Sequence, residues 1–370
     1  MDLSAVLAGP YCTRILAGLG ADVIKIEPPW GDSNRGAEPI KDGRSIYFGI
    51  LNVGKRSVAL DLKTEKDREI LVGLIKQADV LVENFRPGVM TRLGLDYASV
   101  KQLNPAIVYC SISGYGQDSS KRDRPCTAQI IHAGVGYDSA FMSYQPESGP
   151  PPATGLYVAD ALAGSMAVSG ILSALRISER TGTGKHVDIA LDESLLSMLI
   201  YEVASAQYKP DFDRKGYRPL RTMDSYVMAV ETNERTFSGI CNTIGRPELA
   251  LDERFNTKAK RWRNDIELHQ IIEEWTTKRS SEECETLFQG NGVPASTYGT
   301  VKEYIQDPFL QERKTLIKAK NKDSSFLSTG VPFKIRDELG TLYERTDDMA
   351  VPDLGEHTDD VIAELFHMSK

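Results

Sequence analysis

Segments with the pattern of strands and of helices alternate along the first 120 residues of this 370-residue chain. Apolar runs of strand length occur at residues 3–9, 21–27, 57–62, 79–85 and 107–116. Apolar residues at helical spacing fill several of the intervals, at residues 10–20, 64–78 and 97–106. Because such alternation favours a parallel sheet covered by helices on both faces, we expect an α/β fold with a Rossmann-like parallel sheet in a large domain.

The rest of the chain predicts a second, smaller domain. Residues 115–156 are rich in Gly, Pro, Ser and Asp and indicate an irregular connection with one short helix at 128–134. A long helix of small and apolar residues is expected at 159–180, followed by a strand and a helix up to residue 208. We therefore expect four parts, namely a large domain at 1–200, a polar linker at 201–221, a small α+β domain at 222–305 and a C-terminal segment at 306–370.

Composition limits the partners and the compartment. Hydrophobic residues are 41% and charged residues 26% of the chain, and the net charge is −8. A negative charge argues against nucleic acid as the main partner, because phosphate binding needs a basic face. No run of 18 apolar residues predicts a membrane span, and the first residues lack the pattern of a signal or transit peptide. The expected location is cytoplasmic, or mitochondrial if the native N-terminus is longer.

Cysteine and histidine do not indicate a metal site. The sequence has no CxxC pair, and no Cys/His cluster has the spacing of a zinc site, so no metal is expected. Reduced, mostly buried thiols are the simplest interpretation of the cysteines. The histidines are well separated and are expected to be packed or surface residues: His132, His186, His269, His357 and His367.

Several groups that can hold an anion follow the predicted strands. No Walker loop, G-x-S-x-G or H-E-x-x-H motif occurs, and no G-x-G-x-x-G follows the first strand. Gly9 and Pro10 instead mark a strand-to-helix turn, where free N–H groups can meet an anion. The cationic and amide side chains near strand ends are Arg35, Lys55, Arg56, Lys63, Asn84, Arg86 and Arg92. Together they could bind a phosphorylated nucleotide at the carboxyl edge of the sheet.

Asp160 opens the long helix of Ala, Gly and Ser residues. One interpretation is an N-cap, because aspartate commonly caps helices. The other is a nucleophile, because a helix N-terminus stabilises a carboxylate and an ionised Asp can attack an acyl group. Local sequence leaves both open.

In combination, these motifs resemble class III CoA-transferases, the CaiB/BaiF superfamily that includes formyl-CoA transferases and succinyl-CoA:dicarboxylate transferases. The resemblance spans nearly the whole chain in the order of the family. It is carried by VLAGPYCTRILAGLGADVIKIEPPWGDSNRG, LNVGKRSVALDL, ADVLVENFRPGVMTRLGLDY, NPAIVYCSISGYGQ, GLYVADALAG, GILSALRISERTGTGKHVDIAL, GRPELALDERF, GVPASTYGTVKEYIQDP and GEHTDDVIAEL.

The resemblance implies an interlocked homodimer whose C-terminal segment returns to the large domain. It implies that Asp160 is the catalytic carboxylate, forming aspartyl anhydride and thioester intermediates, with coenzyme A or acyl-CoA as substrate and a small carboxylic acid as acceptor. Succinyl-CoA is the donor we expect. The positions that match CoA contacts in the family are Val6, Leu7, Arg35, Leu60, Lys63, Asn84, Phe85 and Arg92.

Departures from the family pattern leave two alternatives. Ala5 replaces the usual Arg or His, Pro125 and Cys126 stand where an aromatic or His precedes Asp, and a segment before YVMAVETNERTF is missing. An α-methylacyl-CoA racemase would need a His and an Asp as paired acid and base, but the expected His position falls near Pro125. The other alternative is a CoA-binding protein with little catalysis.

Overall fold

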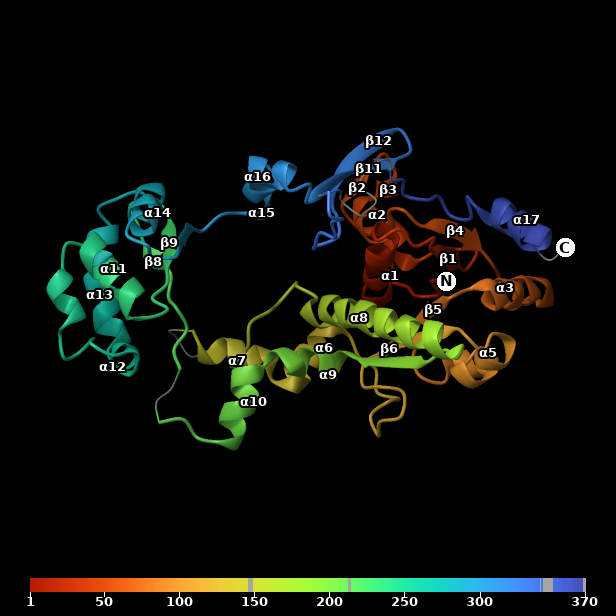
Figure 1. The fold of residues 1–370 in the computed structure, drawn as a ribbon, viewed down its shortest axis with the longest axis horizontal. Helices are drawn as coiled ribbons and strands as arrows, with labels where there is room; N and C mark the ends of the chain where they lie inside the picture. The colour runs from red at the N-terminus through yellow and green to blue at the C-terminus, as the bar shows by residue number, and fades with distance from the viewer. Residues whose placement is uncertain (146–148, 212–213, 340, 342–348, 369–370) are drawn as a thin grey trace. The chain divides into compact units, whose positions relative to one another are not determined.

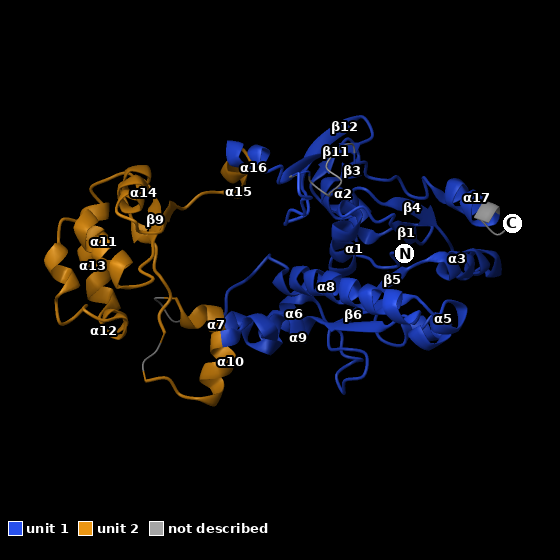
Figure 2. Ribbon diagram, in the orientation of Figure 1, with its two compact units in different colours: residues 1–139, 151–200, 308–370 blue, residues 140–150, 201–307 orange. Residues whose placement is uncertain are grey.

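The computed structural model describes residues 1–145, 149–211, 214–339, 341 and 349–368. Two compact units make up the chain (Figure 2). Unit 1 comprises residues 1–139, 151–200 and 308–370, and unit 2 comprises residues 140–150 and 201–307.

Unit 1 is built on a parallel sheet with strands that the sequence predicts well. In spatial order these are β4 (Arg56–Ala59), β1 (Ile24–Glu27), β5 (Val80–Glu83), β6 (Val108–Ser113) and β7 (His186–Ala190). The predicted strand at residues 3–9 is wrong in extent, because Asp2 alone bridges Lys25 and Val82. The chain then leaves the sheet at Ser4 and enters helix α1 (Ala8–Gly18). The N-terminal residues therefore lie between β1 and β5 and join the two halves of the sheet (Figure 1).

Helices cover both faces of this sheet, as the sequence predicts. On one face, Val82, Val108 and Cys110 pack against α1, α6 (Ala128–Val135), α8 (Val158–Thr181) and α9 (Leu191–Met198). On the other, Leu81 and Tyr109 pack in a core with α3 (Glu65–Gln77), α5 (Tyr97–Leu103) and α17 (Thr358–Met368). The shorter elements of unit 1 are α4 (Val89–Arg92), the 3-10 turn η1 (Ser33–Gly36), β2 (Ile40–Lys41) and β3 (Arg44–Ser45), and α7 (Tyr137–Ser143) runs from unit 1 into unit 2.

The sequence prediction missed helix α2 (Ile46–Asn52) and the hairpin of β11 (Leu316–Asn321) and β12 (Ser324–Thr329). These elements share a small core around Phe48, Ile317 and Ala319. Residues 308–312 form α16 (Pro308–Glu312) before the hairpin. The region read as irregular, 115–156, contains α7 as well as the predicted α6.

Unit 2 has its own core beneath a small antiparallel sheet. The sheet has the order β10 (Ala295–Thr297), β9 (Tyr226–Ala229), β8 (Leu220–Arg221). Phe237, Phe255 and Phe288 lie at the centre of the core. The elements around this core are α11 (Glu234–Thr243), η2 (Pro247–Ala250), α12 (Lys258–Arg263), α13 (Asp265–Thr276) and α14 (Ser281–Gly290). Outside the core are α10 (Ile200–Gln207) and α15 (Val301–Tyr304).

Helices α1 and α8 approach each other closely because α8 presents small residues at the crossing. Ala163 and Ala167 are fully buried there. A Cβ added to Gly164 would lie 2.6 Å from the backbone oxygen of Ala8 and 3.1 Å from the Tyr11 ring. A backbone atom cannot move aside as a flexible side chain would. Gly164 therefore fixes how α8 sits on the start of α1.

We expect Gly164→Ala to lower the free energy of unfolding by about 1–3 kcal/mol, because the new methyl group must push the two helices apart. Gly134→Ala is the matched control, since Gly134 also lies in a helix and its added Cβ would meet nothing within 4 Å. That change should be neutral or stabilising by about 0.5–1 kcal/mol. Urea denaturation of both variants checks the prediction. Equal stability of the two would contradict the role given to Gly164.

Candidate active site

Asp160 lies at the carboxyl edge of the parallel sheet of unit 1. Helix α8 precedes β7, which runs parallel to β6, so α8 begins at the edge where the strands end. Asp160 is the third residue of this helix. Gly164, one turn further on, contacts Ala8 at the start of α1. The turn that carries Asp160 is therefore placed beside the loop that leads into α1.

The structure overturns the N-cap interpretation of Asp160. Tyr157 precedes the helix as the N-cap residue, and no side chain caps it locally. Asp160 lies inside the first turn and is half-buried. Burial raises the pKa of its carboxyl group to about 6, although a hydrogen bond from its own backbone N–H acts in the opposite direction. The group is therefore still ionised at neutral pH, but less strongly solvated than a surface carboxylate.

Two side chains from other segments of unit 1, those of Tyr47 and Cys126, lie near Asp160. Burial raises the pKa of Tyr47, with further contributions from Tyr157 and the Asp160 carboxylate. Burial also raises the pKa of Cys126, and Asp160 raises it further while Arg86 lowers it. These effects place a phenol and a thiol near the carboxylate, and the Arg86 guanidinium near the thiol. Sequence reasoning missed Tyr47 because the helix that carries it was not predicted.

The loop at residues 4–7 is held in an unusual conformation by side chains from two other segments. Asn84 brackets Ala5, accepting its N–H at 2.9 Å and donating to its carbonyl oxygen at 2.8 Å. Asn34 donates to the Val6 carbonyl at 2.6 Å. Val6 has a φ of 67°, a region that a β-branched residue rarely adopts, and its side chain is 51% exposed. The surrounding hydrogen bonds therefore hold a strained, exposed residue at the edge of the sheet.

Two buried ion pairs lie beneath this loop. Lys55 Nζ is 2.9 Å from the Asp2 carboxylate, and both side chains are fully buried. Lys25 Nζ is 3.1 Å from Asp32 and also donates to the Ser4 carbonyl at 2.8 Å. Burial alone would raise the pKa of Asp2, but Lys55 and Lys25 hold it well below its ordinary value. Lys55, singled out by sequence as an anion-binding candidate, is therefore a structural partner of Asp2.

The other predicted CoA-contacting residues lie at strand ends but differ in exposure. Lys63 follows β4 and is exposed, with its ammonium 5.9 Å from the centre of the Trp30 ring. Arg92 ends α4 and is also exposed. Phe85 is partly buried, and its N–H donates to Glu83. Leu7 and Leu60 are buried, with 8% and 2% of their surfaces exposed.

Arg35 is engaged with the protein itself. Its Nε and Nη2 donate to the two Glu27 carboxylate oxygens at 2.7 and 2.6 Å. Its Nη1 donates to the Pro352 carbonyl at 3.1 Å, and its guanidinium carbon lies 4.1 Å from the centre of the Phe48 ring. These contacts connect β1, α2 and the C-terminal segment within unit 1. Its neighbour Asn34, which sequence reasoning passed over, donates to the Val6 carbonyl.

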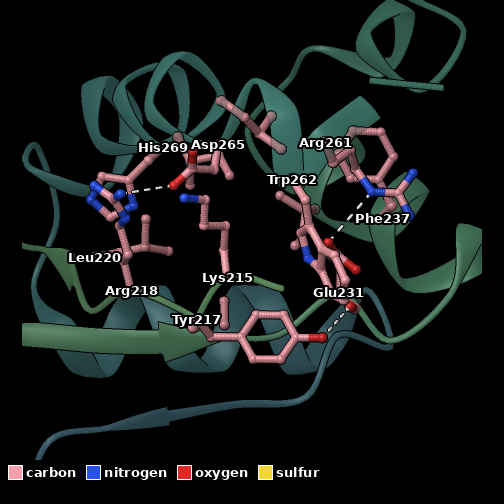
Figure 3. Close-up of a pocket in the computed structure, with 15 residues that line it drawn as sticks. Lys215, Tyr217, Arg218, Leu220, Glu231, Phe237, Arg261, Trp262, Asp265 and His269 are labelled. Atoms are coloured by element: carbon pink, nitrogen blue, oxygen red, sulfur yellow. Dashed lines mark hydrogen bonds and ion pairs between the residues drawn. The ribbon is translucent and has the colours of Figure 1, made fainter. Parts of the chain in front are cut away.

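Within the described residues, neither a pocket in unit 2 nor a metal centre gathers the predicted site residues. Figure 3 shows a cavity of about 90 Å³ inside unit 2, with Leu220 and Phe237 among its apolar lining residues. Two ion pairs lie in its lining, Arg218 with Asp265 at 2.8 Å and Arg261 with Glu231 at 3.5 Å. No predicted catalytic or CoA-contacting residue lines it. Within the part of the chain that the structure describes, no group of three or more His, Cys, Asp or Glu side chains is placed to hold a metal ion.

Comparison with known proteins shows which family the chain belongs to. Residues 1–358 match the sequence profile of CoA-transferase family III. The chain is 33% identical to the succinate–glutarate CoA-transferase of Agrobacterium fabrum, covering 99% of this chain and 94% of that one. It is 35% identical to the acetyl-CoA:oxalate CoA-transferase of Acetobacter aceti, covering 90% and 87%. A succinyl-CoA:mesaconate CoA-transferase of Haloarcula hispanica is 33% identical, covering 92% and 89%.

Solved structures agree with the sequence comparison. A CaiB/BaiF family protein from Brucella suis superposes with a TM-score of 0.83 and 32% identity, covering 98% of this chain and 97% of that one. Rv3272 from Mycobacterium tuberculosis gives a TM-score of 0.85 with 27% identity, covering 97% and 96%. The resemblance that the motifs predicted is confirmed, and the chain belongs to CoA-transferase family III.

Proposed function

We propose that this protein transfers coenzyme A from succinyl-CoA to a small dicarboxylic acid, with Asp160 as the transiently acylated group. The observation that carries the proposal is the half-buried Asp160 carboxylate in the first turn of α8, beside the loop that leads into α1. Similar chains are named as transferases that use succinyl-CoA with mesaconate or D-citramalate, and one is named for succinate and glutarate. These names support the substrate class.

The first half of the reaction follows from the chemistry of a carboxylate nucleophile. An Asp160 carboxylate oxygen attacks the thioester carbonyl of the donor, the C–S bond breaks, and a mixed anhydride and CoA thiolate form. The thiolate then attacks the aspartyl carbonyl carbon. The anhydride C–O bond breaks, the donor acid leaves as a carboxylate, and Asp160 remains as a CoA thioester.

The second half reverses these steps with the acceptor. The acceptor carboxylate attacks the aspartyl thioester and expels the CoA thiolate, giving a second mixed anhydride. Attack of the thiolate on the acceptor carbonyl forms the new acyl-CoA and regenerates the Asp160 carboxylate. No net proton transfer is needed. Partial burial suits this sequence, because each intermediate is sensitive to water and must be shielded from it.

The edge that carries Val6, Lys63, Asn84 and Arg92 is the proposed CoA site. The exposed cations Lys63 and Arg92 can pair with phosphate groups of the nucleotide. The strained Val6 loop presents backbone groups at the same edge, held there by Asn84.

A homodimer is part of the proposal. The side of α8 opposite its buried face exposes Met166, Leu172 and Ile177 by 41%, 45% and 44%, and α9 exposes Leu196 and Met198 by 47% and 45%. Helix α8 is apolar and long enough to cross a membrane by composition, but its other face forms part of the core of unit 1. We propose that a second copy of the chain packs against these exposed apolar side chains of α8 and α9. Light scattering that finds only monomer at micromolar concentration would contradict it.

The structure disfavours the racemase alternative. His132 is the histidine nearest in sequence to the position expected for the base, but its ring is fully buried. Its Nε2 accepts the backbone N–H of Ala159 at 3.2 Å. A nitrogen that is occupied in this way cannot take a proton from the α-carbon of a substrate.

Asp160→Asn should abolish formation of the acyl-enzyme. Incubation with succinyl-CoA followed by hydroxylamine should mark Asp160 in the wild-type protein, as detected by mass spectrometry. The rate of labelling should rise as the pH passes through about 6, because the carboxylate is the attacking form. Asp96→Asn is the matched control, since Asp96 caps α5 and asparagine caps helices equally well. Labelling of the Asp160→Asn variant at the wild-type rate would exclude the proposed nucleophile.

The same substitution should stabilise the protein at neutral pH. Folding raises the pKa of Asp160 to about 6 from an ordinary value of 3.8, so the folded state binds the proton more tightly and loses stability as pH rises between these values. At pH 7.5 we expect the free energy of unfolding of Asp160→Asn to exceed that of the wild type by about 1–3 kcal/mol. The difference should shrink as the pH is lowered from 7.5 to 5. Urea denaturation midpoints of both proteins, measured from pH 5 to pH 7.5, test this prediction. A stability difference that stays constant or reverses its pH trend would contradict it.

Asn84→Ala should weaken acyl-CoA binding, because the Val6 loop loses both hydrogen bonds that bracket Ala5. We expect the KM for acyl-CoA to rise about tenfold, with little change in the KM for the acceptor acid. Asn104→Ala is the control, since Asn104 also ties down backbone carbonyls, those of Ile75 and Ala78, but outside the proposed site. Steady-state kinetics with both substrates varied distinguishes the two. An equal KM effect in both variants would show general destabilisation instead.

A further inference from the structure

The first turn of α8 lacks a local cap, which leaves its N–H groups in need of partners. The Tyr157 side chain makes no capping hydrogen bond. The N–H of Ala161 reaches the Tyr157 carbonyl at 3.1 Å, and the N–H of Asp160 points to its own carboxylate. The N–H of Ala159 instead donates to Nε2 of His132 at 3.2 Å. A histidine on α6 therefore supplies the cap that the α8 sequence lacks.

This contact defines the state of the His132 ring. A nitrogen that accepts a hydrogen bond carries no proton, so the neutral ring has its proton on Nδ1. His132 is 0% exposed, and burial lowers its pKa, which favours the neutral form. Burial therefore favours the form of the ring that can accept this hydrogen bond.

The opposite side of the ring faces the start of α7. The ring of Tyr137 lies 5.1 Å from that of His132, centre to centre, and the Asp138 carboxylate raises the pKa of His132 against the effect of burial. His132 Nδ1 and Asp138 Oδ1 are both buried, and neither has a hydrogen-bond partner within the part of the chain described. One is a donor and the other an acceptor. The two atoms do not bond to each other, so the ring orientation rests on the hydrogen bond that Nε2 accepts from Ala159.

We propose that His132 is a positioning residue that fixes Asp160 by capping the first turn of α8 from a neighbouring helix. The proposal rests on the proposed role of Asp160. Ala159 and Asp160 are consecutive, so the bond at Ala159 limits both rotation and fraying of the turn that carries the carboxylate. A nucleophile must be held close to its attack geometry, and a displacement of about 1 Å costs about a hundredfold in rate. Anchoring the backbone one residue away meets that need without contact with substrate.

Two matched substitutions test the acceptor. His132→Gln places an amide oxygen near the position of Nε2, whereas His132→Asn places one near Nδ1, too short to reach Ala159. His132→Leu removes the acceptor altogether. Ile131→Ala controls for packing, because Ile131 lies on the same helix and is 1% exposed.

Single-turnover acylation by succinyl-CoA is the first measurement. We expect His132→Asn and His132→Leu to slow acylation about tenfold or more, with the KM for acyl-CoA changed by about twofold or less. His132→Gln should acylate within about threefold of wild type, and Ile131→Ala should lose stability but keep its acylation rate. Wild-type acylation by His132→Asn, or acylation by His132→Gln as slow as that of His132→Leu, would overturn the proposal.

Hydrogen exchange supplies a measurement that does not depend on activity. Amide exchange in a peptide spanning residues 155–165 should be faster in His132→Asn than in wild type, and unchanged in His132→Gln. Equal exchange in all variants would overturn the cap even if the enzyme were inactive toward every substrate tried. Absence of acylation in the wild type, with the expected exchange pattern, would count against the proposed function and leave the cap supported.

Discussion

The buried ion pair between Asp2 and Lys55 holds together the part of the protein on which the proposed site depends. Residues 1–3 join the two halves of the parallel sheet, with Asp2 bridging Lys25 on one side and Val82 on the other. Its carboxylate, fully buried, is matched by Lys55 at 2.9 Å and by the Thr13 hydroxyl at 2.7 Å. Removing one partner of such a pair leaves an uncompensated buried charge, which costs about 3–5 kcal/mol. The pair therefore fixes the N-terminal segment in its place between β1 and β5.

The same network extends from the centre of the sheet to the edge where ligands bind in open α/β folds. Lys25 connects the Ser4 carbonyl to Asp32, and Asp32 in turn accepts the N–H of Val6 at 3.3 Å. Asn84 secures Ala5 from the end of β5. The loop is thus fixed from two strands at once. This explains how Val6 is held at a φ of 67° that its own side chain disfavours.

Asp160 is held at the same edge by a different interaction, the close packing of small residues. Gly164 lets α8 press against the backbone of α1, and His132 ties the first turn of α8 to α6. Together these contacts hold a carboxylate in a half-buried position that raises its pKa to about 6. Its burial opposes stability at neutral pH and favours a reactive, poorly solvated nucleophile. Such opposition between stability and function is common at active sites.

The sequence by itself determined the alternation of strands and helices in unit 1, the long small-residue helix α8 and the family, because these depend on periodicity and on long motifs. It did not determine which charged residues face a ligand. In the sequence, Lys55 and Arg35 are cationic residues near strand ends, as are Lys63 and Arg92. In the structure, Lys55 pairs with Asp2 and Arg35 pairs with Glu27. Helix α2, with Tyr47, and the His132 cap were also missed. Each depends on contacts between segments far apart in the chain, and only the tertiary structure brings those segments together.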